Sequence, residues 1–291
     1  MTFDEFACVQ SRRGFLQSVT AGVSTAALAH LLGVEGRTAA TGLPNTDPMA
    51  PRAPHYEPRA KSVILLYMSG GVLPVPVVFR GPNGAAARVA AQHSQCYASW
   101  FAHVPGWRVV APYSAADAKG LLKSAIRDPN PVVFLENELL YGQSFEVPDG
   151  NDHLVPIGEA ALARAGSHAT VAAFSIMVGR ALEAAETLAA EGIEVEVVDL
   201  RSLRPLDGAA VLASVEKTNR LVTVEEGWPF AGIGAEVAAL VMEHAFDMLD
   251  APVARVSGAD IPMPYAANLE AATLPGAKDI ADAVRRVCYR S

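Results

Sequence analysis

The chain has 291 residues, of which 51% are hydrophobic and 19% charged, and its formal net charge is −8. This composition is typical of a globular protein with enough apolar material for two domains of usual size. The acidic balance argues against nucleic acid and against stable binding to an anionic membrane, because both would repel it. The three cysteines, Cys8, Cys96 and Cys288, have neither zinc-ligand spacing nor a disulfide pattern, which fits a reducing compartment.

The first sixty residues differ in character from the rest. Ser11–Leu16 places an arginine pair before a moderately apolar run at 19–32, and this order resembles a twin-arginine export signal. An amphipathic surface helix that begins with the arginine pair is the alternative. Polar residues interrupt the run, so it would span a membrane poorly.

A proline-rich linker is expected at 36–60, because proline fixes φ and removes a hydrogen-bond donor. The apolar segment 61–68 after it reads as a buried strand. From Arg12 to Gly71 the chain resembles the start of a family of exported bacterial proteins of uncharacterised function.

A first α/β unit is predicted at 61–142. Ser114 is a good N-cap, with Asp117 in the first turn of the helix that follows. Because strand, helix and strand follow one another, a right-handed crossover and a parallel sheet are expected. The predicted elements are strands at 75–79, 107–112 and 131–136, a tight loop at 80–84, and helices at 85–91 and 115–127.

Ligands of open parallel sheets bind beyond the carboxyl ends of the strands. Three segments fall there: the loop from Arg80 to Gln95, the residues after Val110, and Glu136–Glu138. His93 in the first segment could exchange a proton near neutral pH. A capping or hydrogen-bonded loop histidine is the other interpretation.

A second α/β unit is predicted at 155–291, after a linker at 141–152. Gly192 is expected in the left-handed conformation that ends a helix. Gly232–Gly234 is a weak nucleotide-loop candidate, and glycine relieving crowding before a helix is the better interpretation. The predicted elements are strands at 169–174, 195–200, 221–224 and 253–256, and helices at 178–190, 206–216, 232–245 and 278–288.

Long ordered segments resemble the pyruvate dehydrogenase beta-subunit family, which is transketolase-like. The resemblance implies a truncated pyrimidine-binding parallel-sheet domain followed by a transketolase C-terminal-type α/β domain. It begins at about Gly71 and meets the resemblance to the exported family at Tyr67–Gly71, which indicates a hybrid chain. The matching segments are Arg80–Gly84, Ala90–Gln95, Asp117–Asp128, Leu135–Gly142, Asp199–Asp207, Lys217–Gly227 and Pro262–Tyr265.

This resemblance implies the oxidative decarboxylation of pyruvate with thiamine diphosphate, which leads from glycolysis to acetyl-CoA. An alpha subunit, expected in a heterotetramer with this chain, would hold the cofactor's diphosphate through magnesium. The acetyl unit would pass to a lipoyl group on an acyltransferase core. The family's glutamate that activates the aminopyrimidine ring has no match in Met1–Ser69, which puts activity in doubt.

The resemblance also implies roles for individual residues. His93 matches a histidine near the cofactor and the lipoyl entrance. Asp250 matches a position in the region that binds the acyltransferase core, and the C-terminal domain builds the contact between beta subunits. A potassium ion would be held near Val77, Ala125, Ile126, Asp128 and Asn130.

The main expectation is an enzyme subunit in the bacterial cytoplasm. The alternatives are an inactive truncated chain, a hybrid exported by the twin-arginine route, or the beta subunit of an acetoin or branched-chain 2-oxoacid dehydrogenase.

Overall fold

The structure is a computed structural model that describes residues 75–86, 88–150 and 152–290. All of them lie in one compact unit that runs from Leu66 to Ser291. The predicted export signal, the proline-rich linker and the predicted strand at 61–68 lie outside the described residues.

The first sheet contains the expected parallel strands. Its order is β1 (Val78–Pro82), β3 (Val132–Glu136) and β2 (Arg108–Val110), all parallel, with α4 (Ala115–Arg127) crossing between β2 and β3. Ser114 caps α4 as predicted, because its side chain accepts a hydrogen bond from the Asp117 amide. The fourth strand comes from the second half of the chain and was not predicted: β7 (Ser202–Arg204) pairs antiparallel with β2.

The segment after β1 departs from the prediction. The strand starts at Val78 rather than at Val75, and it includes Arg80–Pro82, which were expected in a loop. The helix predicted at 85–91 is wrong: α2 has four residues, Ala90–His93, and α3 (Ala98–His103) follows. Arg88 and Ala90 have φ values of 58° and 59°, which a continuous right-handed helix excludes. Tertiary contacts override the helical propensity of the alanines here.

The second sheet is mixed. Its order is β4-β6-β5-β8-β9, and β4 alone among these strands runs antiparallel to its neighbour. Gly192 has the expected positive φ, 77°, after α5. The predictions missed β4, the short helix α8 and the two 3-10 helices. The elements are β4 (Ala161–Arg164), β5 (Ala169–Ala173), β6 (Val195–Asp199), β8 (Leu221–Val224) and β9 (Ala254–Val256), with α5 (Ile176–Ala189), α6 (Gly208–Thr218), α7 (Ile233–His244), α8 (Ala267–Thr273) and α9 (Ala277–Val287), and the 3-10 helices η3 (Glu138–Gly142) and η4 (Phe246–Met248).

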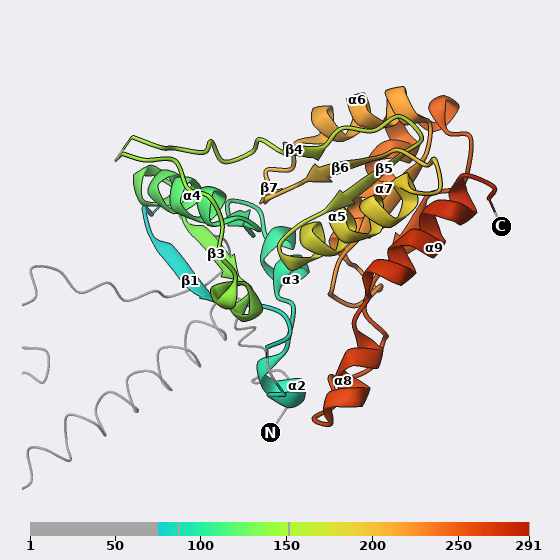
Figure 1. Cartoon of the computed structure of the whole chain (residues 1–291). Helices are drawn as coiled ribbons and strands as arrows, with labels where there is room; N and C mark the ends of the chain where they lie inside the picture. Colours follow the sequence, from blue (N-terminus) through green and yellow to red (C-terminus); the bar gives the residue numbers. More distant parts are fainter. Residues whose placement is uncertain (1–74, 87, 151, 291) are drawn as a thin grey trace, which may run out of the picture. The chain divides into compact units, whose positions relative to one another are not determined.

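Alternate residues of the second sheet enter different cores, as strand geometry requires. Val171 and Val197 belong to the core that includes residues of α5 and α9, whereas Ala172 and Val198 belong to the core that includes residues of α6 and α7. Figure 1 shows α5 and α9 on one side of the second sheet and α6 on the other. This second core also includes Val109 of β2, together with other residues of the first sheet and of α3. One continuous apolar core therefore joins the two sheets.

The other face of the first sheet packs on α4 through a smaller core that includes Leu121 and Phe134. Within the described part of the chain, no helix has both the length and the run of apolar residues that crossing a membrane requires.

Candidate functional site

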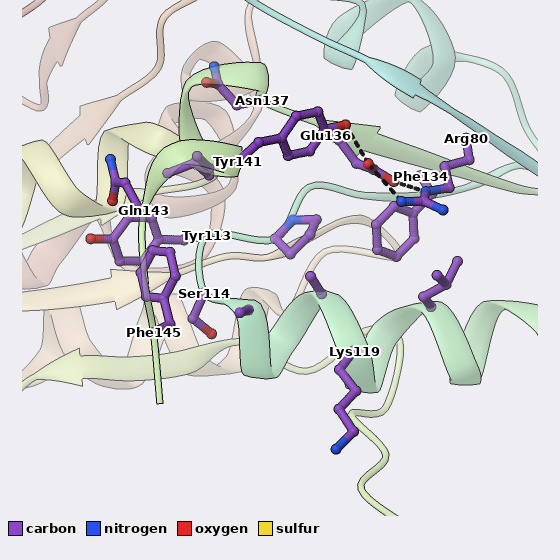
Figure 2. Close-up of a pocket in the computed structure, with 15 residues that line it drawn as sticks. Arg80, Tyr113, Ser114, Lys119, Phe134, Glu136, Asn137, Tyr141, Gln143 and Phe145 are labelled. Atoms are coloured by element: carbon purple, nitrogen blue, oxygen red, sulfur yellow. Dashed lines mark hydrogen bonds and ion pairs between the residues drawn. The ribbon is translucent and has the colours of Figure 1, made fainter. Parts of the chain in front are cut away.

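The carboxyl ends of the parallel strands of the first sheet border a cavity of about 400 Å³ (Figure 2). Parallel strands bring their carboxyl ends to one edge, so this is where a ligand of an α/β sheet is expected. The wall is formed by the end of β3, by η3 and by the start of α4. The larger apolar and aromatic side chains in it are Tyr113, Leu122, Phe134, Leu140, Tyr141 and Phe145.

Three polar side chains interact at the rim of this cavity. The guanidinium of Arg80 donates from Nε and Nη2 to the two carboxylate oxygens of Glu136, and the Nη2–Oε2 distance is 3.2 Å. The hydroxyl of Tyr141 donates to Glu136 Oε2 at 2.6 Å. Desolvation and this hydrogen bond raise the pKa of Tyr141 to about 12. Tyr141 therefore remains a donor at neutral pH, and the Glu136 carboxylate is fixed in place.

Next to Glu136, Asn137 belongs to a buried polar cluster. Its amide nitrogen lies 3.0 Å from Oε1 of Glu226, at the end of β8, and its carbonyl oxygen accepts from the Leu139 amide and so begins η3. Burial raises the pKa of Glu226 to about 7 and that of the neighbouring Cys96 thiol to about 12. Cys96 therefore stays a neutral thiol.

The segment 83–97 leaves the carboxyl end of β1 and carries His93; we call it the His93 loop. The loop is closed at its base, where the Gly84 amide donates to the Gln95 carbonyl at 2.8 Å and the Tyr97 amide donates to Oδ1 of Asn83 at 2.6 Å. His93 ends α2 with an exposed side chain. Among the described residues the ring has no hydrogen-bond partner, so it is available to a ligand or a second subunit.

The potassium-site residues lie at the opposite, amino end of the first sheet. The carbonyl of Val77 accepts from the Val132 amide, and that of Ala125 accepts from the Asp128 amide. The Asp128 carboxylate is engaged with Arg108 at 2.7 Å and with Asn130 at 2.8 Å. The predicted fifth contributor, Ile126, has an exposed side chain.

Asp250 lies far from the cavity in sequence and follows η4. Its carboxylate pairs with Arg220 at 3.0 Å, and its carbonyl accepts from the Tyr289 hydroxyl at 3.1 Å. Asp250 therefore lies next to the second sheet, because its partner Arg220 immediately precedes β8.

The weak nucleotide-loop candidate has a structural explanation. The carboxylate of Glu225 accepts hydrogen bonds from the amides of Ile233 and Gly234 at 3.0 and 2.9 Å, so it occupies the N-terminus of α7. A Cβ on Gly232 would lie 2.2 Å from Oε1 of Glu225. Glycine therefore relieves crowding before a helix, as predicted, and the amides that would bind a phosphate are already bonded.

Sequence reasoning selected the segments around Arg80, His93 and Glu136. Arg80 and Glu136 line the cavity, whereas His93 is not among its lining residues, and the sequence reasoning missed two contributors. Tyr141 was predicted in a linker, and Glu226 was not singled out. The paired carboxylates that follow the apolar strand 221–224 were the available signal, since charges beside a buried strand require partners.

Comparison with known proteins identifies a related domain family for each half of the chain. Residues 49–143 match the family described as "Transketolase, pyrimidine binding domain", and residues 158–280 match "Transketolase, C-terminal domain". The "Pyruvate dehydrogenase E1 component subunit beta" of Rickettsia felis is 58% identical over 225 residues, which cover 77% of this chain and 69% of the relative. The protein of the same description from Rhizobium meliloti is 61% identical over 225 residues.

The chain spans between about half and two thirds of several of these relatives. It covers 49% of the Rhizobium meliloti protein and 63% of the Arabidopsis thaliana "Pyruvate dehydrogenase E1 component subunit beta-1, mitochondrial", which is 62% identical. Among solved structures, "Split gene transketolase, inactive beta4 tetramer" is similar, with a TM-score of 0.61 and 26% identity. That likeness covers 73% of this chain and 66% of the solved one.

Proposed function

The chain belongs to the family of pyruvate dehydrogenase E1 beta subunits, whose domains are of the transketolase type, and on this premise we propose that it is the beta-type subunit of a pyruvate dehydrogenase. The reaction would be the thiamine-diphosphate-dependent oxidative decarboxylation of pyruvate with transfer of the acetyl group to a lipoyl group. The observation that carries the proposal is identity of 58–62% to relatives of that description over segments that include the His93 loop and the Glu136–Gly142 segment.

The described residues fit the cofactor only in part. Oε1 of Glu136 is bonded to Arg80 and Oε2 to Arg80 and Tyr141, so this carboxylate is not free for a pyrimidine ring. No group of three or more His, Cys, Asp or Glu side chains within the described ranges is arranged to hold a metal ion. We therefore assign diphosphate and magnesium binding to an alpha subunit, and the ring-activating carboxylate to none of the residues that the structure describes.

His93 is the residue of this chain that we assign to the chemistry. Its exposed ring stands on a loop at the carboxyl edge of the first sheet, where a neutral imidazole can donate to or accept from a reacting group and a protonated one can donate. Bound thiamine diphosphate supplies the electron sink for decarboxylation. The ring of His93 would stabilise charge or move a proton beside it.

Two further assignments belong to the same proposal. A potassium ion would bind carbonyl oxygens at the C-terminus of α4, near Val77, Ala125, Ile126, Asp128 and Asn130, because helix C-terminal carbonyls carry partial negative charge and each retains a second lone pair. Asp250 would lie in the surface that binds the lipoyl acyltransferase core.

Reconstitution tests the proposal. The full chain is mixed with an alpha subunit from a related pyruvate dehydrogenase, and carbon dioxide release from pyruvate is measured. We expect activity that depends on both subunits and on thiamine diphosphate. His93→Ala should lower kcat by about 100-fold, since general acid–base groups contribute this much. His103→Ala is the matched control, because His103 also ends a short helix with an exposed side chain.

Stable binding to the alpha subunit without decarboxylation would instead favour the inactive truncated chain. If the complex were more active on branched-chain 2-oxoacids or acetoin than on pyruvate, that compound would be assigned as the substrate instead of pyruvate.

We propose a cytoplasmic location for the chain, as suits a partner of the lipoyl core. Export through the twin-arginine signal resemblance at Ser11–Leu16 is the competing location. Cell fractionation decides between them, since an exported chain would be found outside the cytoplasm and shortened at its N-terminus.

A further inference from the structure

The His93 loop has little secondary structure of its own to fix it. Among the described residues between Asn83 and Tyr97, the regular structure is the four-residue helix α2, and a helix of that length is unstable in isolation. The hydrogen bonds at Gly84–Gln95 and Asn83–Tyr97 close the base of the loop but do not attach it to the C-terminal half. The position of His93 therefore depends on what else holds the loop.

A buried carboxylate from the second sheet contacts the start of the loop. Glu226 is 8% exposed, and it accepts a hydrogen bond from the side-chain amide of Asn137 at 3.0 Å. Asn137 also lies 3.5 Å from the Asn83 carbonyl. Glu226 is thus linked through Asn137 to Asn83, the first residue of the loop.

The backbone of the loop is shaped around this carboxylate. Gly84 has φ +83°, and a Cβ built on it would lie 1.5 Å from Oε1 of Glu226. A glycine is required both by the conformation and by the close approach of the carboxylate. The positive φ of Gly84 and the proximity of the Glu226 carboxylate therefore each exclude a larger residue at this position.

A second carboxylate holds the loop further along. Oε2 of Glu270, in α8, accepts from the Arg88 amide at 3.0 Å, and Arg88 has the positive φ that breaks the predicted helix. This contact is exposed, so it is weaker than the buried one. Both carboxylates belong to the C-terminal half of the chain, 182 and 89 residues from their hydrogen-bond partners Arg88 and Asn137.

We propose that Glu226, assisted by Glu270, is a positioning residue that holds the His93 loop in place from the C-terminal domain. The attachment of the loop stands on geometry alone. Its consequence for catalysis rests on the proposed function of His93. Neither carboxylate touches the reacting atoms, and each acts through the loop.

A small cavity beside Glu226 leaves little free space around its carboxylate. It has a volume of about 10 Å³, which is room for about one water molecule, and Ser94 and Glu226 both line it. The Ser94 hydroxyl is buried without a protein partner in the described residues. A water there would link the residue after His93 to the same carboxylate.

Hydrogen–deuterium exchange of the full chain tests the attachment without any need for activity. Glu226→Ala should accelerate exchange of peptides from residues 83–97 at least tenfold, whereas peptides from β5 and α5 should be unchanged. Glu226→Gln should be intermediate, because its amide oxygen can still accept one hydrogen bond. Glu270→Ala should produce a smaller increase, and Glu186→Ala on exposed α5 surface is the matched control.

A double-mutant comparison makes the test independent of general destabilisation. Asn137→Ala and Glu226→Ala should be strongly non-additive in loop exchange, since each removes the same hydrogen bond. Should Glu226→Ala fail to fold, Glu226→Gln and Asn137→Ala carry the same test. Unchanged loop exchange in folded Glu226→Gln and Asn137→Ala would overturn the proposal.

The consequence for His93 is read by NMR of labelled histidine in the full chain. The His93 ring signal, identified by its loss in His93→Gln, should shift and narrow in Glu226→Gln towards that of an unconstrained histidine, while the His168 signal stays in place. In the reconstituted complex, Glu226→Gln should lower kcat more than it raises KM. A loosened loop without any activity in the wild type would refute the proposed function and leave the positioning role intact.

Discussion

Arg201 and Asp117 form an ion pair that joins the two sheets. The Arg201 Nη1 atom lies 2.6 Å from Oδ1 of Asp117, and both side chains are about 15% exposed. Arg201 follows β6 of the second sheet, whereas Asp117 lies in the first turn of α4 beside the first sheet. The same guanidinium donates to the carbonyl of Glu159 at 2.8 Å. The pair therefore fixes the start of α4, one wall of the cavity, to the second sheet.

Removal of this ion pair should destabilise the chain. Asp117→Ala deletes a charge-assisted hydrogen bond and leaves a mostly buried guanidinium with backbone carbonyls but without this carboxylate, and we expect a loss of about 2 to 3 kcal/mol in the free energy of unfolding. Urea denaturation of the full chain measures it. Asp149→Ala at an exposed position is the control. A loss no larger than that of the control would show that the pair is energetically neutral.

Asp199 predicts a pH dependence of stability. Burial and the neighbouring Asp117 raise its pKa to about 8, against opposing contributions from Arg201. The folded chain therefore holds a proton that the unfolded chain releases near pH 4, so the carboxyl lowers stability as pH rises from about 4 to 8. Asp199→Asn removes this decline, and its stability relative to wild type should increase between pH 5.5 and 8.5.

Urea unfolding at three pH values in that range checks this prediction. The asparagine can still accept from the Arg201 amide, which lies 3.0 Å from Oδ1. The exposed Asp247→Asn should leave the pH slope as it is in wild type. Parallel pH slopes for wild type and Asp199→Asn would contradict the raised pKa.

Gly84→Ala separates the cost of conformation from that of crowding. The positive φ should cost about 1 to 3 kcal/mol, and the overlap with Glu226 adds to it. Gly192→Ala is the matched control, because its φ of +77° is similar and a Cβ there meets nothing within 4 Å. Thermal or urea unfolding should show the larger loss at Gly84. Equal losses at the two glycines would mean that Glu226 moves aside without cost.

The carboxylate at the start of α7 should stabilise that helix. Glu225→Ala leaves the amides of Ile233 and Gly234 without their acceptor, and the expected loss is about 1 to 2 kcal/mol. Glu225→Gln should recover part of it through one oxygen. Glu236→Ala, exposed in the same first turn, is the control for charge near the helix N-terminus. Equal unfolding midpoints for Glu225→Ala and Glu236→Ala would remove the capping role.

Much of the fold could be predicted because its determinants are local. The strands at β3, β5, β6 and β8 are uninterrupted buried runs, as parallel strands covered on both faces require. Ser114 caps a helix three residues from its partner, and Gly192 takes a conformation that other residues avoid. Such features can be predicted from a few neighbouring residues of the sequence.

The candidate site was predicted in its segments but not in its contacts. The tendency of ligands to bind at the carboxyl edge of a parallel sheet was enough to select the regions of Arg80 and Glu136, which line the cavity, while the role of His93 stays a prediction. It could not reveal that Tyr141 completes the Arg80–Glu136 interaction, since a 3-10 helix folds the tyrosine back onto the strand.

By itself the sequence determined the family, the parallel strands and helices, and the likeness of the His93 segment to a catalytic histidine, because these depend on patterns within continuous segments. Only the tertiary structure decided that the alanine-rich stretch after Gly84 is not a helix, that β7 completes the first sheet, and that Glu226 holds the loop. The reason is physical: Asn137 and Glu226 are 89 residues apart, and a hydrogen bond over that separation leaves no local pattern.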